Sequence, residues 1–143
     1  MDAPLRLAPS TAIVFDTNVL LSAFIFRKFA GDVYQYCAER YLLYSSEWML
    51  AELSEKLESK KFRLPLTLQE TILVQVREDV QLVYPTNEMP NYSRDPDDNN
   101  VLRLALFIKA NFIITGDRDL LDLGQVEKTE IISPKLFFER YMM

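Results

Sequence analysis

The chain has 143 residues, which suits one compact domain with a sizeable core, so we expect residues 1–143 to form a single domain. The formal net charge is −5, which argues against broad, charge-driven binding of nucleic acid but allows a local basic patch. The sequence has no histidine and one cysteine, which excludes Ser–His and Cys–His nucleophile pairs, histidine-ligated zinc and an intrachain disulfide framework. Acid–base or metal chemistry must therefore come from carboxylates, lysine, tyrosine or water.

The N-terminal segment MDAPLRLAPSTA has neither a long apolar core nor a small-residue cleavage pattern. We expect residues 1–11 to be a short tail rather than a signal peptide. The longest apolar runs are far shorter than a membrane-spanning helix. These features predict a cytoplasmic protein that does not associate with a membrane.

Secondary structure can be predicted from apolar periodicity and from the residues that favour helix ends. Gly31 is expected to separate two helices, Ser46 to cap a third, and Thr67 with Glu70 to form a T-x-x-E capping box. The predicted order is strand 12–15, helix 19–26, helix 32–40, strand 41–44, helix 47–60, helix 67–79, strand 80–84, loop 86–97, helix 98–110, strand 112–115, helix 117–121, strand 130–132 and a closing helix from Pro134.

Strands alternate with helices along the whole chain. This alternation predicts an α/β fold with a mainly parallel central sheet and helices on both faces, a three-layer α/β/α sandwich. In such sheets the ligand site lies beyond the carboxyl ends of the strands. The acids that follow these ends are therefore the first candidates for chemistry.

Three aspartates are expected to meet at this edge of the sheet. Asp16 ends the first strand, and Asp117 lies just beyond Thr115, which ends a later strand. Asp98 opens the helix that leads into that later strand, and the fold returns helix starts to the same edge. The sequence therefore predicts a cluster of Asp16, Asp98 and Asp117.

Each aspartate also has a simpler interpretation, because Asp commonly caps a helix. The same holds for the neighbouring Asp97, while Asp119 can face solvent. Carboxylates a few ångströms apart nevertheless repel one another, and they either raise each other's pKa or bind a cation. With oxygen ligands alone, the favoured ions are Mg²⁺ and Mn²⁺.

The predicted helix 47–60 carries four glutamates beside its apolar stripe. Periodicity does not distinguish one that faces inward, and a solvated charged face explains them all. The four residues are Glu47, Glu52, Glu55 and Glu58.

Taken together, four segments resemble the PIN-domain nucleases. VFDTNVL resembles the first strand and acid of that family, and YSSEWMLAELSEKL its second strand and the helix with the second acid. DDNNVLRLALFIKANFIITGDRDL is similar to the segment with the third and fourth acids, and IISPKLFFERY to the closing strand and helix. The resemblance extends from about residue 12 to residue 141 and rests on the order and spacing of these segments.

The resemblance implies a site residue by residue. The catalytic and metal-binding acids it implies are Asp16, Glu52, Asp98 and Asp117. It favours Asp98 over Asp97 because Ala105 fits the small helix-packing position of the family. The supporting residues it implies are Asn18, Thr115, Asp95 and Asp119. Such neighbours fix the orientation of metal-binding carboxylates.

The resemblance also implies an activity. PIN-domain nucleases cleave phosphodiester bonds, mostly in RNA, with Mg²⁺ or Mn²⁺, and without histidine the leaving oxygen would take its proton from water. The RDPDDN segment resembles a prokaryotic branch that often supplies the toxin of a toxin–antitoxin pair, the VapC type. Such toxins usually form homodimers and are silenced by a cognate antitoxin protein.

An RNA substrate would still have to approach an acidic protein. A basic group that could guide it comprises Lys56, Lys60, Lys61 and Arg63, with Arg27 and Lys28 nearby in the predicted fold. A solvated helix end explains the KLESKKFR segment equally well. Three phenylalanines between residues 24 and 29 offer either core packing or an apolar interface for a second copy or an antitoxin.

Two other functions are compatible with parts of the pattern. A phosphatase of the haloacid-dehalogenase type also begins with an apolar strand and an aspartate, but it needs an acid where this chain has Asn18. The other alternative is a catalytically inactive PIN-like module that binds RNA or protein. The presence of all four acids argues against it.

Overall fold

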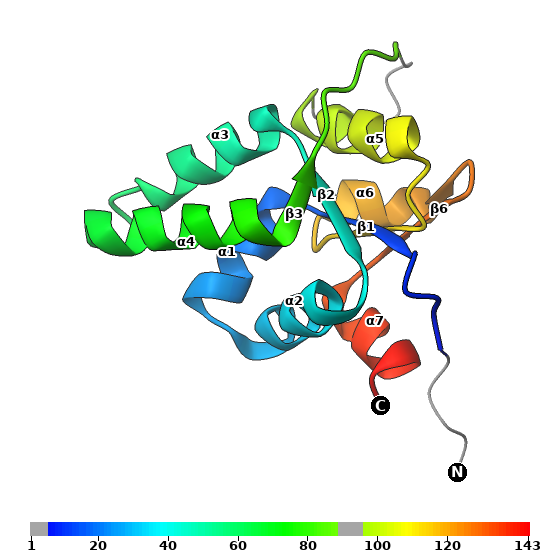
Figure 1. Ribbon diagram of the computed structural model, residues 1–143, viewed down its shortest axis with the longest axis horizontal. Helices are drawn as coiled ribbons and strands as arrows, with labels where there is room; N and C mark the ends of the chain where they lie inside the picture. Colours follow the sequence, from blue (N-terminus) through cyan, green and yellow to red (C-terminus); the bar gives the residue numbers. More distant parts are fainter. Residues whose placement is uncertain (1–5, 89–95) are drawn as a thin grey trace.

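The computed structural model describes residues 6–88 and 96–143, which form a central sheet surrounded by helices (Figure 1). Strands and helices alternate as the sequence predicts. The elements are β1 Ala12–Phe15, α1 Thr17–Ile25, α2 Lys28–Arg40, β2 Leu42–Ser45, α3 Glu47–Leu57, α4 Leu66–Asp79, β3 Val80–Leu82, α5 Pro96–Ile108, β4 Phe112–Ile114, α6 Arg118–Leu123, β5 Gln125–Val126, β6 Thr129–Ile132 and α7 Pro134–Tyr141.

The strands form one sheet in the order β3-β2-β1-β4-β6-β5. All neighbouring strands are parallel except β5, which is antiparallel to β6. In the middle of the sheet, Val14 of β1 lies opposite Tyr44 of β2 on one side and Ile113 of β4 on the other. The mainly parallel sheet predicted from the sequence is therefore confirmed.

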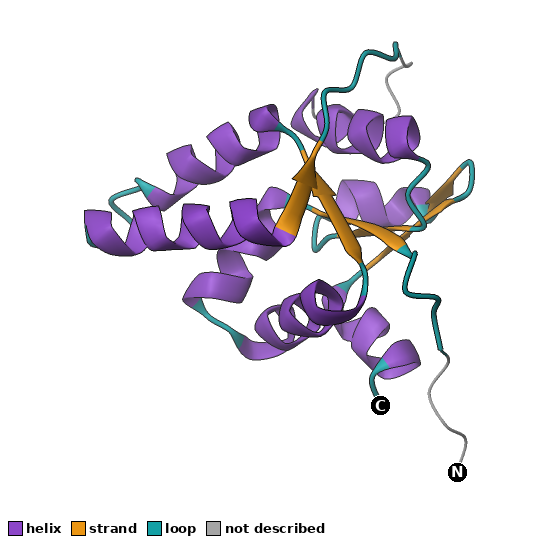
Figure 2. Ribbon diagram, viewed as in Figure 1, coloured by secondary structure: helices purple, strands orange, loops and turns teal. Residues whose placement is uncertain are grey.

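Both faces of the sheet are covered by helices, as Figure 2 shows for the orange strands and purple helices. Ile13 and Phe15 of β1 pack into an apolar cluster with α1, α2, α4 and α7, and Val14 between them packs into a second cluster with α5 and α6. Alternate residues of a strand point to opposite faces, so this division follows from the pleat. The three-layer α/β/α architecture is confirmed.

Helix starts agree with the sequence at Ser46 and disagree at Thr67. The Ser46 hydroxyl accepts a hydrogen bond from the Met49 amide at 3.2 Å, which is the predicted cap of α3. The capping box is wrong, because α4 already begins at Leu66, with Pro65 at the N-cap position. Proline suits the start of a helix because its missing N–H is not needed there.

Gly31 does not separate two helices but lies inside α2, which begins at Lys28. A Cβ atom at Gly31 would lie 3.2 Å from the Ala23 carbonyl oxygen and 3.2 Å from the Arg27 Cβ atom. Glycine therefore permits a close approach between α1 and α2. Gly31 thus allows the two helices to pack closely and does not end a helix as predicted.

Three further observations bear on the predictions made from the sequence. Strand β5 was not predicted, since a strand of two residues has no detectable alternation. Cys37 is fully buried in the core, as predicted, and burial raises the pKa of its thiol. None of the described helices combines the length and the apolar character needed to cross a bilayer.

Candidate active site

The carboxyl ends of β1 and β4 are hydrogen-bonded neighbours at the centre of the sheet. The chain leaves β1 towards β2 on one side, whereas β4 lies on the other side. This divergence opens the edge of an α/β sheet to a ligand. The Asp16 amide donates to the Ile114 carbonyl at 3.0 Å, so Asp16 and Thr115 lie next to each other at this point.

Thr115 connects two of the predicted acids. Its hydroxyl donates to Oδ2 of Asp16 at 2.7 Å and accepts from the Asp117 amide at 2.9 Å. Asp117 in turn accepts from the Asp119 amide at 2.9 Å and so caps α6. The supporting role that the resemblance implies for Thr115 fits this geometry, because one buried hydroxyl fixes the positions of Asp16 and Asp117.

Asp16 occupies the N-cap position of α1, but its carboxylate does not cap the helix in the part of the chain that the structure describes. The simpler interpretation of Asp16 as a helix cap therefore fails for its side chain. The residue is only 5% exposed, and burial raises the pKa of its carboxyl group. The Thr115 hydroxyl and the Lys56 charge lower this pKa, whereas the negative charges of Glu52 and Asp117 raise it further.

Asp98, Asp117 and Asp119 form a compact group of carboxylates. One oxygen from each lies within 4.8 Å of the other two. Asp98 is buried in the first turn of α5, while Asp119 is exposed. Asp119, which the sequence suggested only as a supporting residue, therefore lies where a ligand to a cation would lie.

Glu52 of α3 reaches this edge of the sheet together with a lysine. The Lys56 ammonium donates to Oε1 of Glu52 at 2.8 Å and to Oδ1 of Asn18 at 2.8 Å. The Glu52 side chain is only 13% exposed, so it is not part of a solvated face. The structure thus singles out Glu52 where periodicity did not, and it shows a contact of Lys56 that the sequence analysis missed. The E-x-x-x-K spacing on one helix face was the available signal.

The oxygen-rich composition of this edge fits a hard divalent cation. All candidate ligands are carboxylates, which suit Mg²⁺ or Mn²⁺ better than softer metals. Burial is the main cause of the raised pKa of Asp16, and the charges of Glu52 and Asp117 add to it, so bound positive charge would favour the ionised carboxylate. Asp98, Asp117 and Asp119 can hold such an ion, with Asp16 and Glu52 beside them.

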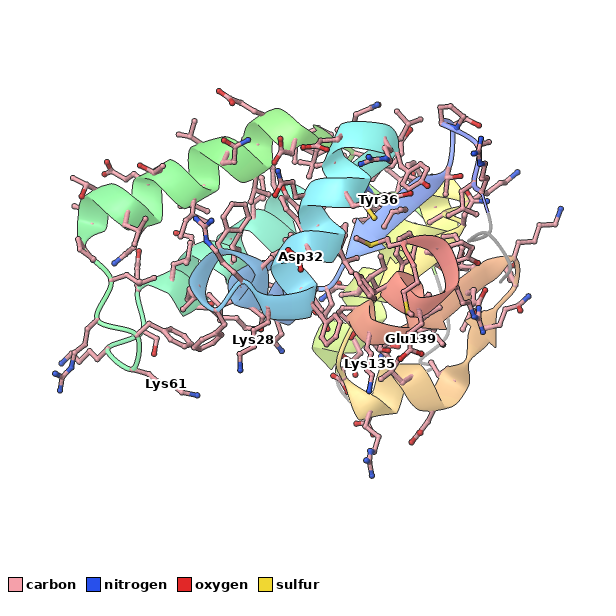
Figure 3. All side chains as sticks on the ribbon, turned by 90° about the horizontal axis from the view of Figure 1, so that it is seen from below. Lys28, Asp32, Tyr36, Lys61, Lys135 and Glu139 are labelled. Carbon is pink, nitrogen blue, oxygen red and sulfur yellow. The ribbon has the colours of Figure 1, made fainter. Side chains whose placement is uncertain are left out.

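The other predicted residues lie away from this group or outside the described residues. Asp95 falls in residues 89–95 and is not described. Lys60, Lys61 and Arg63 are exposed in the connection between α3 and α4. Figure 3 shows Lys61 extending from this connection away from the body of the protein.

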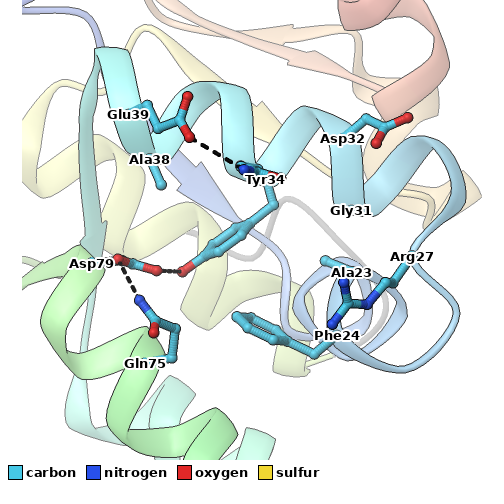
Figure 4. A pocket seen from close by; sticks show the side chains of 11 residues that line it. Ala23, Phe24, Arg27, Gly31, Asp32, Tyr34, Ala38, Glu39, Gln75 and Asp79 are labelled. Carbon is cyan, nitrogen blue, oxygen red and sulfur yellow. Dashed lines mark hydrogen bonds between the residues drawn. The ribbon is translucent and has the colours of Figure 1, made fainter.

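A shallow cleft of about 320 Å³ adjoins the acids and is lined by Asn18, Gly116 and Asp117, among other residues. A second cavity of about 390 Å³ lies among α1, α2 and α4 (Figure 4). There Asp79 accepts hydrogen bonds from the Tyr34 hydroxyl at 2.6 Å and from the Gln75 amide at 3.0 Å. None of the clustered acids lines the second cavity, and its central carboxylate, that of Asp79, is satisfied by these two hydrogen bonds. The cleft beside the acids is therefore the better candidate for a substrate site.

The sequence matches the family model described as PIN domain over residues 12–119. The protein belongs to the PIN domain family. The matched segment contains every acid placed at the carboxyl edge of the sheet by the structure. PIN domains are nucleases, and the carboxylate group described above is the feature of this chain that fits such chemistry.

Comparison with solved structures gives matches at low sequence identity, one of them with a clearly similar fold. A chain of the VapBC2 assembly from Rickettsia felis, bound to a DNA fragment from their promoter, superimposes with a TM-score of 0.62 and 12% identity, covering 86% of this chain and 98% of that chain. PAE2754 from Pyrobaculum aerophilum matches with a TM-score of 0.48 and 17% identity, covering 92% of this chain and 89% of that chain. Among curated proteins, none matches this sequence.

Proposed function

We propose that this PIN domain is a Mg²⁺- or Mn²⁺-dependent endoribonuclease that hydrolyses phosphodiester bonds of RNA in the cytoplasm, with residues 1–143 as one nuclease domain. The observation that carries the proposal is the group of three carboxylates within 4.8 Å of one another at the carboxyl edge of the sheet. A divalent cation would offset the repulsion among these carboxylates, and hydrolysis of phosphodiesters is chemistry that such a cation supports.

Each residue has a distinct task in this proposal. Asp98, Asp117 and Asp119 hold the ion, and Asp16 is kept in place beside them by the Thr115 hydroxyl. A divalent ion bound there would lower the pKa of an attacking water and offset the charge that develops on the phosphate oxygens. With no histidine in the chain, water protonates the leaving oxygen.

The basic connection between α3 and α4 offers a path for the RNA backbone. Phe62 of this connection makes an edge-to-face contact with Phe26 at a ring-centroid distance of 6.1 Å, which brings it beside the end of α1. The Lys61 ammonium lies 5.5 Å from the Phe62 ring centre. Phe26 is exposed and Phe62 partly buried, and aromatic rings beside cations suit single-stranded RNA, whose bases stack while its phosphates pair with lysine.

Cleavage of single-stranded RNA in the presence of Mn²⁺ or Mg²⁺ tests this function. The wild-type protein should cut the RNA, EDTA should stop the reaction, and the Asp16→Asn and Asp98→Asn variants should be inactive although they remain folded. Equal cleavage by wild type and both variants would indicate a contaminating nuclease. Absence of cleavage over a broad RNA panel would instead leave a PIN-like module that binds RNA or protein.

We further propose that the protein is the toxin of a toxin–antitoxin pair. The fold it shares with a chain of VapBC2 supports this role, and the acidic edge suits a basic segment of a cognate antitoxin protein. Phe26 and Phe29 are 57% and 46% exposed, which suits an interface with that partner or with a second copy in a homodimer. Induced expression should arrest growth for the wild type and not for Asp98→Asn, and light scattering should give twice the chain mass.

A further inference from the structure

Lys56 is a partly buried positive charge at the acidic edge of the sheet. Its ammonium lies 2.8 Å from Oε1 of Glu52 and 2.8 Å from Oδ1 of Asn18. The Lys56 side chain is 32% exposed, and the Glu52 side chain is 13% exposed. The partly buried ammonium therefore lies at the acidic edge, beside the place where a divalent ion is proposed to bind.

The two contacts distinguish Lys56 from an ordinary pair along one helix. Glu52 and Lys56 are in the same helix, but Asn18 belongs to α1, which is distant in the sequence. Two acceptors on different helices hold the ammonium in one position, whereas an exposed lysine pair on a helix is mobile and contributes little. Lys56 also acts on a third group, since its charge lowers the pKa of Asp16.

The hydrogen bond from Lys56 competes with a role of Glu52 as a metal ligand. Oε1 of Glu52 accepts from the ammonium, so a divalent ion bound to this carboxylate would lie close to a second positive charge, and two cations that share one carboxylate repel each other. We propose that Lys56 is a built-in competitor of the divalent ion: it occupies Glu52 in the absence of metal and sets the metal affinity of the site. This inference rests on the proposed function in one respect, namely that the acidic edge binds a divalent ion.

Calorimetric titration of the full chain with Mn²⁺, without RNA, tests the competition. Lys56→Met keeps the length of the side chain but removes its charge, and it should bind Mn²⁺ on the order of tenfold more tightly than the wild type. Lys60→Met removes the same charge from an exposed position beyond α3 and should bind Mn²⁺ within about twofold of the wild type, because solvent screens charges at the surface. Equal affinities of the Lys56→Met variant and the wild type would overturn the proposal.

A double-mutant cycle separates competition for Glu52 from a general effect of charge. In the Glu52→Gln background the carboxylate for which the two cations compete is gone, so Lys56→Met should increase Mn²⁺ affinity far less. An undiminished increase in that background would overturn the proposal in favour of a long-range charge effect. Lys56→Gln serves as a second neutral variant, and thermal unfolding of each protein verifies that it is folded.

The Mn²⁺ titration and the RNA cleavage assay test separate proposals, so either proposal can be contradicted without the other. If Lys56→Met tightens Mn²⁺ binding but the wild type cuts no RNA, the competition is supported and the nuclease function is not. If the wild type cuts RNA with metal but Lys56→Met leaves the Mn²⁺ affinity unchanged, the nuclease function is supported and the competition is not. If Lys56 served only to bind RNA, its substitution would leave the Mn²⁺ affinity in RNA-free buffer unchanged.

Discussion

The hydroxyl of Thr115 donates a 2.7 Å hydrogen bond to the carboxylate of Asp16 across 99 positions of sequence. Both residues are buried at adjoining strand ends, and the same hydroxyl accepts from the Asp117 amide at 2.9 Å. One uncharged side chain thereby sets the distance between two candidate ligands. This bond therefore helps to hold the candidate ligands in position.

Thr115→Val removes both hydrogen bonds while keeping the shape of the side chain. We expect it to lower the free energy of unfolding by about 2 kcal/mol, because a buried carboxylate loses its donor. Cleavage of RNA should fall roughly 10- to 100-fold, since Asp16 and Asp117 are no longer held in place. Urea unfolding and single-turnover kinetics measure the two effects.

Thr71→Val is the matched control, because the Thr71 hydroxyl bonds the Thr67 carbonyl on the exposed face of α4. It should change stability by less than about 0.5 kcal/mol and leave cleavage unaffected. Equal effects of the two substitutions would mean that Thr115 has no special role.

The raised pKa of Asp16 gives stability a specific pH dependence. Burial raises this pKa above the ordinary value of 3.8, so the native state binds the proton more tightly than the unfolded state does. The resulting stabilisation is complete below pH 3.8 and is lost as the pH rises through the raised pKa of the native protein. At neutral pH the buried charge therefore destabilises the metal-free protein.

Asp16→Asn should consequently be more stable than the wild type at pH 7 in EDTA, and the difference should shrink as the pH falls. Each unit of pKa displacement corresponds to about 1.4 kcal/mol. Urea unfolding of both proteins between pH 4 and pH 8 measures the difference. A variant less stable than the wild type at pH 7 would show that the Thr115 hydrogen bond outweighs the cost of burying the charge.

The sequence was sufficient to predict the architecture and the edge at which the acids meet. Strand β1 was predicted to the residue because a short apolar run ends abruptly at Asp16. Asp16 and Asp117 could be placed together because parallel strands share a carboxyl edge, a rule that needs no side-chain detail. The family matched over residues 12–119 is also the one that the motifs resembled.

The sequence did not predict features that depend on contacts between distant elements. Gly31 has the signature of a helix breaker, and only the approach of α1 explains it inside α2. Lys56 was predicted either to guide RNA or to belong to a solvated helix end, because periodicity cannot show that Asn18 of another helix accepts from its ammonium. In both cases the decisive partner lies on α1.

Divalent ions should stabilise the native protein if the acidic edge binds them. At a concentration of one hundred times the Kd, binding adds about 2.7 kcal/mol, which is a rise in Tm of roughly 10 °C for a chain of this size. Thermal unfolding in Mn²⁺ and in NaCl of equal ionic strength measures the specific part. Asp98→Asn should show little of this rise, because the variant lacks one of the three clustered carboxylates.

An unchanged Tm in Mn²⁺ would contradict a metal site. An equal rise in the Tm of Asp98→Asn would show that Mn²⁺ binds at another site. The matched control is Asp122→Asn, which removes an exposed carboxylate from α6 outside the cluster. It should retain the full effect of Mn²⁺. This comparison assigns the metal effect to the position of the carboxylate rather than to net charge.

The basic connection between α3 and α4 should contribute to RNA affinity through its charges. Replacement of Lys60, Lys61 and Arg63 by glutamine in an Asp98→Asn protein, which cannot cut, should weaken binding of single-stranded RNA. Each phosphate contact contributes about 0.7 to the slope of log affinity against log salt, so the slope should fall by about 2. Fluorescence anisotropy over a range of NaCl concentrations measures both quantities.

A control must remove the same charge from another part of the surface. Lys109, Lys128 and Lys135 are exposed cations outside the α3–α4 connection, and their replacement by glutamine changes the net charge equally. If RNA follows the α3–α4 connection towards the acids, the first triple variant loses affinity and slope, whereas the second changes little. Equal losses in both would show that the RNA responds only to the net charge of the protein, and the basic connection would then have no role as a path to the site.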